Sequence, residues 1–331
     1  MSIVGHRQSF YGQIASNRRK SILLVLIVFL LMAGIGLAIG LAMGATVESG
    51  VVGIVVAIVV AMVITSISYF SGDSLVLAAS GAKEVSPENA PQLMNVVNEL
   101  SIAAGIPPPK VYLINDTAPN AFATGRDPKH ASVAITTGLL QKLDREELQG
   151  VMAHELAHVR NLDIRFTLLV GALVGSIVLL TDFFLRFSFY GGMSGGRSRG
   201  RDSGGGGAAA ILFIIALALA IVAPFFARLV QLAVNREREY LADASSVELT
   251  RNPYGLQRAL AKIAGDTEVL EVANRATQHL YIVNPIKRFE ERSKGLMSTH
   301  PSVVERINRL RALSGEAPLA PGDHEALAQL G

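Results

Sequence analysis

The stretch Leu148–Leu180 reads LQGVMAHELAHVRNLDIRFTLLVGALVGSIVLL, and its character changes halfway along. The first half mixes apolar and polar residues as an amphipathic helix does, whereas the second half, from Phe166, is apolar enough to enter a membrane. The pattern H-E-x-x-H lies in the first half, at His154, Glu155 and His158. The stretch therefore predicts a metal-binding helix that stands next to a lipid bilayer.

The composition of the whole chain favours a membrane protein. Of its 331 residues, 50% are hydrophobic and only 17% are charged, and the mean hydropathy is +0.39. The net charge of +3 is small for this length, so no nucleic-acid partner is expected. Cysteine is absent, which excludes disulfides and thiolate metal ligands.

Four apolar segments are long enough to cross a bilayer, which takes about 20 residues. Two uncharged segments fill most of residues 21–70, and two less regular ones begin at Phe166 and Ala208. The sequence therefore predicts an integral membrane protein with four transmembrane helices. The second pair, residues 166–233, either spans the membrane or forms a re-entrant hairpin, because its Gly/Arg-rich loop 187–206 carries three arginines.

Basic residues predict how these segments are oriented, since they gather on the cytoplasmic side. The tail 1–20 holds three arginines and a lysine, and the turn 44–50 holds none. We therefore expect a multi-pass membrane protein, with both termini and the metal-binding pattern facing the cytoplasm. The expected segments are a basic tail (1–20), a transmembrane hairpin (21–70), two catalytic parts (71–165 and 234–313) separated by the second hairpin (166–233), and a flexible tail (314–331).

Secondary structure in the catalytic parts is predicted to be α+β and mainly helical. The stretches KVYLIND and HASVAITT read as strands. A helix is expected after Ser86, with Ser86 as N-cap and Pro87 at its first position, and another from Pro253 to Ala264. The helix that carries H-E-x-x-H should begin at Asp144, because Asp144 and Glu147 form a capping box.

The spacing of the H-E-x-x-H residues suits zinc chemistry. His154 and His158 are one turn apart on a helix, so both imidazoles can face one metal ion, while Glu155 can reach a water beside it. A catalytic zinc needs a third protein ligand, which here must be His, Asp or Glu. Glu239 in NREREYLADASS is the best candidate, and Asp243, one turn later, can accept the second N–H of a ligating histidine.

Distances along the chain place these residues near the bilayer. On a continuous helix, Phe166 lies about 12 Å beyond His158, and Glu239 lies about 9 Å beyond Ala233. A hairpin over 166–233 would therefore bring the ligands together at a similar height, whether it spans the membrane or re-enters.

Three stretches of sequence, one of which includes H-E-x-x-H, carry a resemblance to a known family: PNAFATGRDPKHASVAITTGLLQKLDREELQGVMAHELAHVRNLD, REREYLADA and LMSTHPSVVERINRLRAL. With the four apolar segments, they resemble the HtpX-type membrane zinc metalloproteases, a bacterial heat-shock protease group related to the CAAX prenyl proteases. The resemblance implies a gluzincin-type metallopeptidase domain, with one Zn²⁺ per chain bound by His154, His158 and Glu239. It also implies that Glu155 is the general base.

The resemblance assigns roles to residues outside the metal-binding pattern. Asn120, Ala121 and Phe122 would form an edge strand that holds an extended substrate by backbone pairing. His300, at the start of a helix capped by Thr299 or His300 itself, would stabilise the oxyanion of the tetrahedral intermediate. Arg306 is a weaker candidate for support of the transition state.

The expected function is a membrane-anchored zinc endopeptidase that cleaves misfolded membrane proteins and their cytosolic segments, as in stress response and protein quality control. Two alternatives are a non-catalytic membrane scaffold with a structural zinc site and a CAAX-type processing protease. A structural zinc usually has four protein ligands, so three ligands next to Glu155 favour catalysis. The sequence does not indicate an oligomeric state.

Overall fold

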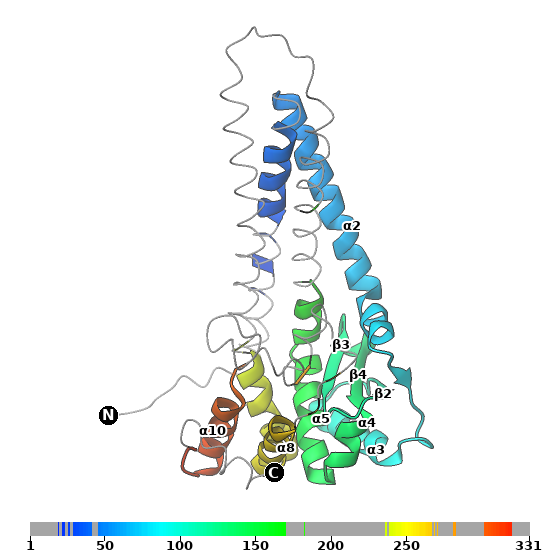
Figure 1. Cartoon of the computed structure of the whole chain (residues 1–331), viewed down its shortest axis with the longest axis vertical. Helices are drawn as coiled ribbons and strands as arrows, with labels where there is room; N and C mark the ends of the chain where they lie inside the picture. Colours follow the sequence, from blue (N-terminus) through cyan, green and yellow to red (C-terminus); the bar gives the residue numbers. More distant parts are fainter. Residues whose placement is uncertain are drawn as a thin grey trace, which may run out of the picture. The chain divides into compact units, whose positions relative to one another are not determined.

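A computed structural model describes residues 19, 22–23, 26, 29–41, 46–169, 182, 236, 238–266, 268, 270, 281–282 and 301–319. The chain divides into two compact units. The small unit comprises Arg18–Tyr69 and Leu169–Gln231, and the large unit comprises Met1–Asn17, Phe70–Leu168 and Leu232–Gly331. The long helix α2 (Val47–Ala79) contributes residues to both units (Figure 1).

Two helices of the small unit approach until their backbones touch. A Cβ added at Gly53 would lie 2.9 Å from the backbone carbon of Gly36, and one at Gly40 would meet Ser49. Glycines allow such close helix contacts inside a bilayer. Among the described residues, α2 is the one helix long and apolar enough to cross a membrane, and Phe29–Leu41 is a shorter apolar helix.

The four predicted transmembrane helices are therefore supported only in part. The third and fourth predicted spans lie outside the described residues, apart from the first positions of the third and Asp182. The Gly/Arg-rich loop 187–206 and the tail beyond residue 319 also lie outside them.

A four-stranded sheet, in the order β1-β2-β4-β3, forms the centre of the large unit. Its strands are β1 (Lys83–Glu84), β2 (Lys110–Ile114), β3 (Ala121–Gly125) and β4 (Ala131–Thr136). The strands β2 and β4 are parallel, whereas β3 is antiparallel to β4 and lies at the edge. The strands predicted at KVYLIND and HASVAITT are thus confirmed, and the NAF stretch does lead into an edge strand.

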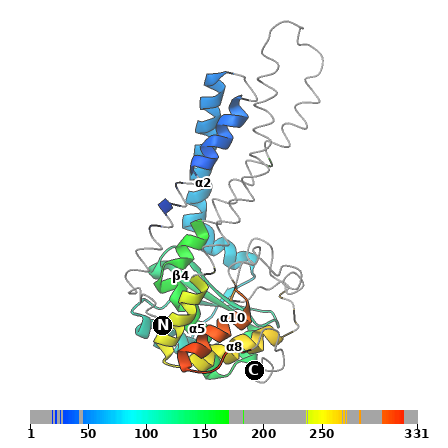
Figure 2. The same cartoon turned by 90° about the vertical axis from the view of Figure 1, so that its left-hand side faces the viewer.

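Helices cover this sheet and form most of the core. They are α3 (Pro91–Ala104), α4 (Thr137–Lys142), α5 (Arg145–Arg160), α8 (Pro253–Gly265) and α10 (Val303–Ser314), with the short 3₁₀ helix η1 (Pro128–His130) between β3 and β4. Figure 1 shows α8 between α10 and α5, both pairs are in contact, and Figure 2 shows the same helices from the side. At the α5–α8 crossing, a Cβ on Gly150 would lie 2.5 Å from the Leu256 nitrogen. This crossing therefore requires glycine.

Two helix starts differ from the sequence-based prediction. The helix expected after Ser86 begins at Pro91, because proline drives the residue before it, Ala90, out of the α region, to φ −146° and ψ 63°. Ser86 accepts the Ala90 N–H instead and begins a turn. The cap of α10 is Ser302, whose hydroxyl accepts the Glu305 N–H at 3.2 Å, and not Thr299 or His300.

The helix α5 does not run on to Phe166, so the expected continuous helix is also wrong. It ends at Arg160, and Leu162 takes a left-handed conformation with φ 60° before helical residues resume at 163. This break turns Asp163 back towards the metal-binding pattern, with consequences for the site.

Candidate active site

The position of α5 is fixed at its N-terminus. The predicted capping box is present: the Asp144 carboxylate accepts the Glu147 N–H at 2.9 Å, and the Glu147 carboxylate accepts the Asp144 N–H at 2.9 Å. Buried Glu147 also pairs with Lys262 of α8 at 2.8 Å. Charge pairing and the glycine crossing therefore hold the helix that carries His154, Glu155 and His158.

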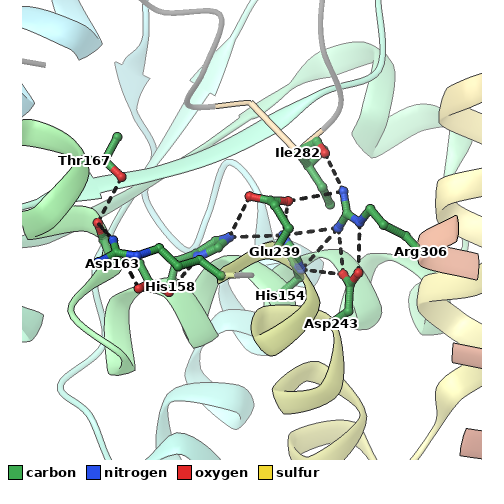
Figure 3. A network of polar contacts seen from close by, with 9 residues as sticks. His154, His158, Asp163, Thr167, Glu239, Asp243, Ile282 and Arg306 are labelled. Atoms are coloured by element: carbon green, nitrogen blue, oxygen red, sulfur yellow. Dashed lines mark hydrogen bonds and ion pairs between the residues drawn. The ribbon is translucent and has the colours of Figure 1, made fainter. Parts of the chain in front are cut away.

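Three side chains converge from two helices (Figure 3). His154 and His158 project from α5, and Glu239 projects from the helical residues 238–250. The two Nε2 atoms are 3.2 Å apart, and each lies 3.6 Å from an oxygen of Glu239. Their ligand atoms all lie within 4.8 Å of one another, so the three residues could hold one metal ion.

A carboxylate lies behind each histidine. His154 Nδ1 is 2.9 Å from Asp243 Oδ1, and His158 Nδ1 is 3.1 Å from Asp163 Oδ2. Such a partner accepts a hydrogen bond from Nδ1–H, which keeps the proton on Nδ1 and leaves Nε2 free to bind metal. The contact of Asp243 matches the sequence prediction, whereas the break at Leu162 creates that of Asp163.

A buried arginine lies behind each carboxylate in turn. Arg306 of α10 donates two hydrogen bonds to the Asp243 carboxylate, at 2.7 and 2.9 Å. It donates a third to the Ile282 carbonyl at 2.7 Å. Its Nη1 also lies 3.4 Å from Glu239. Burial lowers the pKa of Arg306, but Asp243 and Glu239 outweigh burial and raise it above its usual value.

The second arginine, Arg238, holds Asp163 less tightly. Its Nη1 lies 3.4 Å from Asp163 Oδ1, and its guanidinium stacks 3.5 Å from the ring centroid of Phe166. Burial lowers the pKa of Arg238 to about 10, although Asp163 partly opposes this. Arg238 Nε and Nη2 have no hydrogen-bond partner within the described part of the chain, so Asp163 is its main anion.

The buried ionisable groups of the site shift one another's pKa values. Burial and Arg306 lower the pKa of His154, but Asp243 and Glu239 outweigh them and raise it to about 9. Burial also raises the pKa of Glu155, despite the nearby histidines. Glu155 is 1% exposed, and its Oε1 has no hydrogen-bond partner among the described residues. A buried carboxylate oxygen needs a donor, so Glu155 fits a water at the metal site.

The donor set fits zinc. Two imidazole nitrogens and one carboxylate oxygen are ligands that zinc accepts, and three protein ligands leave a fourth position open, as in catalytic zinc sites. Each histidine already has an outer partner, and Glu155 stands beside the group without being part of it. Bound zinc would supply a Lewis acid that polarises a carbonyl and lowers the pKa of water.

The remaining predicted residues lie in different surroundings. Asn120 is buried, its N–H donates to Thr136 Oγ1, and its side-chain oxygen accepts the Ala121 N–H. Phe122 is buried in a hydrophobic cluster behind the sheet. Arg306 is occupied by carboxylates and a carbonyl, so its contacts support the metal ligands, and its transition-state role stays a prediction. His300 lies outside the described residues.

Sequence reasoning missed Asp163, Arg238 and Ile282. Only Asp163 left a signal, because Asn-Leu-Asp directly after a metal-binding helix is a plausible helix end. Arg238 and Ile282 belong to no local sequence pattern that would place them beside Asp163 or Arg306.

A buried group of two histidines and a glutamate, with a second glutamate beside it, defines a metallopeptidase site of the H-E-x-x-H class. The chain belongs to peptidase family M48, whose family model matches residues 87–314.

The relatives of this chain that carry names are also proteases. The chain is 47% identical over 248 residues to the "Protease HtpX homolog" of Thermoanaerobacter pseudethanolicus, covering 75% of this chain and 80% of the relative. The relative of that name in Listeria monocytogenes serotype 4a is 44% identical over 305 residues, covering 91% and 98%. A crystal structure of S. mikatae Ste24p is similar at 17% identity and a TM-score of 0.47, covering 90% of this chain and 66% of that one.

The family and the relatives confirm the expected class, so the chain is a membrane zinc metalloprotease. Members of family M48 depend on zinc in general, and in the described part of this chain His154, His158 and Glu239 form a group that could bind a metal.

Proposed function

We propose that this protease is an endopeptidase that cleaves misfolded or damaged membrane proteins and their cytosolic segments, as part of a stress response. One zinc ion per chain is held by His154, His158 and Glu239. The observation that carries the catalytic part of the proposal is the buried Oε1 of Glu155, which lacks a hydrogen-bond partner in the described region and lies beside the three ligands.

In this proposal each side chain has a defined task. Glu155 accepts a proton from the attacking water and delivers it to the leaving amine. Asp243 and Asp163 fix the tautomers of His154 and His158. His300 would donate to the oxyanion of the tetrahedral intermediate.

The substrate is proposed to lie along β3. A strand at the edge of a sheet can bind an extended peptide through backbone hydrogen bonds, which tolerate many side chains, and β3 is an edge strand. Misfolded proteins offer such extended segments without a shared sequence. The NAF stretch begins this edge, because Ala121 and Phe122 are its first two residues.

We propose that the protease acts while it is embedded in a membrane. The apolar side chains Val51, Val55, Val59 and Phe70 of α2 are more than 45% exposed, as suits a helix in lipid. We propose a multi-pass protein of the plasma membrane whose site and termini face the cytoplasm. This orientation places the site beside the cytosolic segments of membrane proteins.

The two alternatives are less well supported. Family membership and three ligands beside a free carboxylate oxygen favour a catalytic site over a structural one. No observation on the described residues favours the second alternative, processing of prenylated C-terminal peptides.

A comparison of wild type with Glu155→Gln in detergent tests the proposal. We expect both proteins to hold one zinc per chain and only wild type to cleave unfolded casein, with a loss on the order of 10²–10⁴-fold in the variant. If wild type binds zinc and cleaves neither casein nor a destabilised membrane protein, the proposed role of Glu155 and the proposed substrate class are wrong.

A further inference from the structure

The residues of the edge strand β3 alternate in orientation: the backbone N–H and C=O groups of one set point towards β4, and those of the other set point away from it. Asn120 accepts the Thr136 N–H at 3.0 Å, so its backbone groups point towards β4. In an antiparallel ladder such residues alternate with residues whose N–H and C=O point away. The register pairs Ala121 with Ile135 and Ala123 with Val133, so Ala121 and Ala123 face the free edge.

The outward groups of Ala121 are already used. Its N–H donates to the Asn120 side-chain oxygen at 3.1 Å, and its carbonyl accepts the Ile282 N–H at 2.9 Å. Ala123 differs: it is 7% exposed, and its outward N–H and C=O have no hydrogen-bond partner among the residues that the structure describes. Next to it, the buried hydroxyl of Thr124 also lacks a partner there.

Residues 281 and 282 are anchored firmly at this edge. Tyr281 is 0% exposed, stacks edge-on against Phe122 at 5.2 Å and lies 3.4 Å from the Ser80 hydroxyl. Ile282 is 2% exposed and packs in the main hydrophobic cluster, on the other face of the sheet from Tyr281. The two side chains thus alternate between faces as strand residues do.

The Ile282 peptide also reaches the metal centre. Its carbonyl accepts Arg306 Nη1 at 2.7 Å, and Arg306 in turn holds Asp243 and contacts Glu239. One residue therefore connects the edge strand to the arginine behind a metal ligand, as Figure 3 shows for Ile282 and Arg306.

We infer that Ile282 closes the Ala121 end of the β3 edge, so that a substrate strand pairs from Ala123 onwards and its register against the metal is fixed. Ile282 is thus a positioning residue that selects which peptide bond is cut. This inference rests on the proposed function, since it assumes that substrate lies along β3. It differs from the expectation that Asn120, Ala121 and Phe122 hold the substrate.

Mapping of cleavage sites tests the inference on the full-length protein. Ile282→Pro removes the N–H that occupies Ala121, and the control Ile282→Ala keeps it. With casein as substrate and products identified by mass spectrometry, we expect wild type and Ile282→Ala to cut the same bonds. Ile282→Pro should add cuts displaced by two residues, the spacing between Ala121 and Ala123 on one edge.

A second pair of variants does not depend on how Ile282→Pro folds. Ala123→Pro removes an outward N–H and spares the ladder to β4, and Ala123→Ser keeps that N–H. We expect Ala123→Pro to raise KM about 2- to 10-fold, which corresponds to the loss of one hydrogen bond to the substrate. The variant should still hold one zinc per chain. Ala123→Ser keeps the backbone hydrogen bond to substrate, so it should raise KM less than Ala123→Pro does.

Several results would overturn the inference. One is an unchanged set of cut bonds in a folded, zinc-loaded Ile282→Pro. Another is faster cutting at the same bonds, because the 281–282 segment would then have to leave before substrate binds. An unchanged KM in Ala123→Pro would also refute it. If wild type cuts nothing, the proposed function fails as well, and that result is distinct from the others.

Discussion

Replacement of Asp163 by alanine should separate metal binding from folding. The buried carboxylate of Asp163 lies 3.1 Å from His158 Nδ1 on one side and 3.4 Å from Arg238 Nη1 on the other. Loss of a carboxylate behind a ligating histidine typically weakens metal binding by about 10–100-fold. This corresponds to about 1.4–2.8 kcal/mol of zinc-binding free energy.

The same change should also destabilise the fold, because Arg238 is 4% exposed and would lose its main anion. Breaking a buried ion pair by removing one partner costs about 3–5 kcal/mol. The long Arg238–Asp163 distance of 3.4 Å places the expected loss in unfolding free energy at the lower end of that range. The stacking of Arg238 on Phe166 is expected to persist.

A double variant, Asp163→Ala with Arg238→Met, distinguishes the two effects. Removing both charges should restore most of the unfolding free energy, since no unpaired buried charge remains. It should not restore zinc affinity, because His158 still lacks its partner. Zinc affinity is measured by competition with a chelator of known affinity, and unfolding by circular dichroism, because the chain has no tryptophan.

Asp127→Ala serves as the matched control, because Asp127 caps η1 far along the chain from the ligands and its carboxylate pairs with His130. It should leave zinc affinity unchanged. The reasoning is refuted if Asp163→Ala binds zinc within about twofold of wild type. It is equally refuted if the double variant recovers zinc affinity together with stability, because the loss then came from the unpaired arginine.

Three further predictions follow from the fold and the site. Gly150→Ala should lower the unfolding free energy by about 1–3 kcal/mol through overlap with Leu256, whereas Gly265→Ala, with nothing within 4 Å of the added Cβ, should not lower it; thermal melts compare the two. A chelator should abolish casein cleavage and lower the melting temperature, and added zinc should restore both; cleavage that survives complete removal of zinc would contradict the metal site. In the cysteine-free chain, a cysteine at Thr46 should react with an impermeant maleimide in intact cells, and one at Lys129 only after lysis; the reverse pattern would invert the proposed topology.

The parts of the site that lie within one helix could be predicted from sequence. The spacing of His154 and His158, and that of Glu239 and Asp243, sets their faces by helical geometry alone, and the structure brings both pairs together. The capping box at Asp144 is an equally local pattern.

The missed contacts depend on structure that no local pattern encodes. Asp163 reaches His158 only because the chain reverses at Leu162, a non-glycine residue at φ 60°. Which residues of β3 face its free edge follows from the ladder with β4, and strand order is a property of the whole sheet. Ile282 meets Ala121 across 161 positions of sequence, a distance over which periodicity carries no information.

The arginine that supports Asp243 comes late in the chain, and this order matters during synthesis. Arg306 follows His158 by 148 positions. At about 5–20 residues per second, a ribosome needs roughly 7–30 s to make that stretch. During the first part of that interval the nascent chain has both histidines but neither Glu239 nor Asp243. During all of it the chain lacks Arg306. A nascent chain therefore cannot hold Asp243 in place until Arg306 has been made, so the order of its residues delays the fully supported metal centre well beyond the synthesis of the histidines.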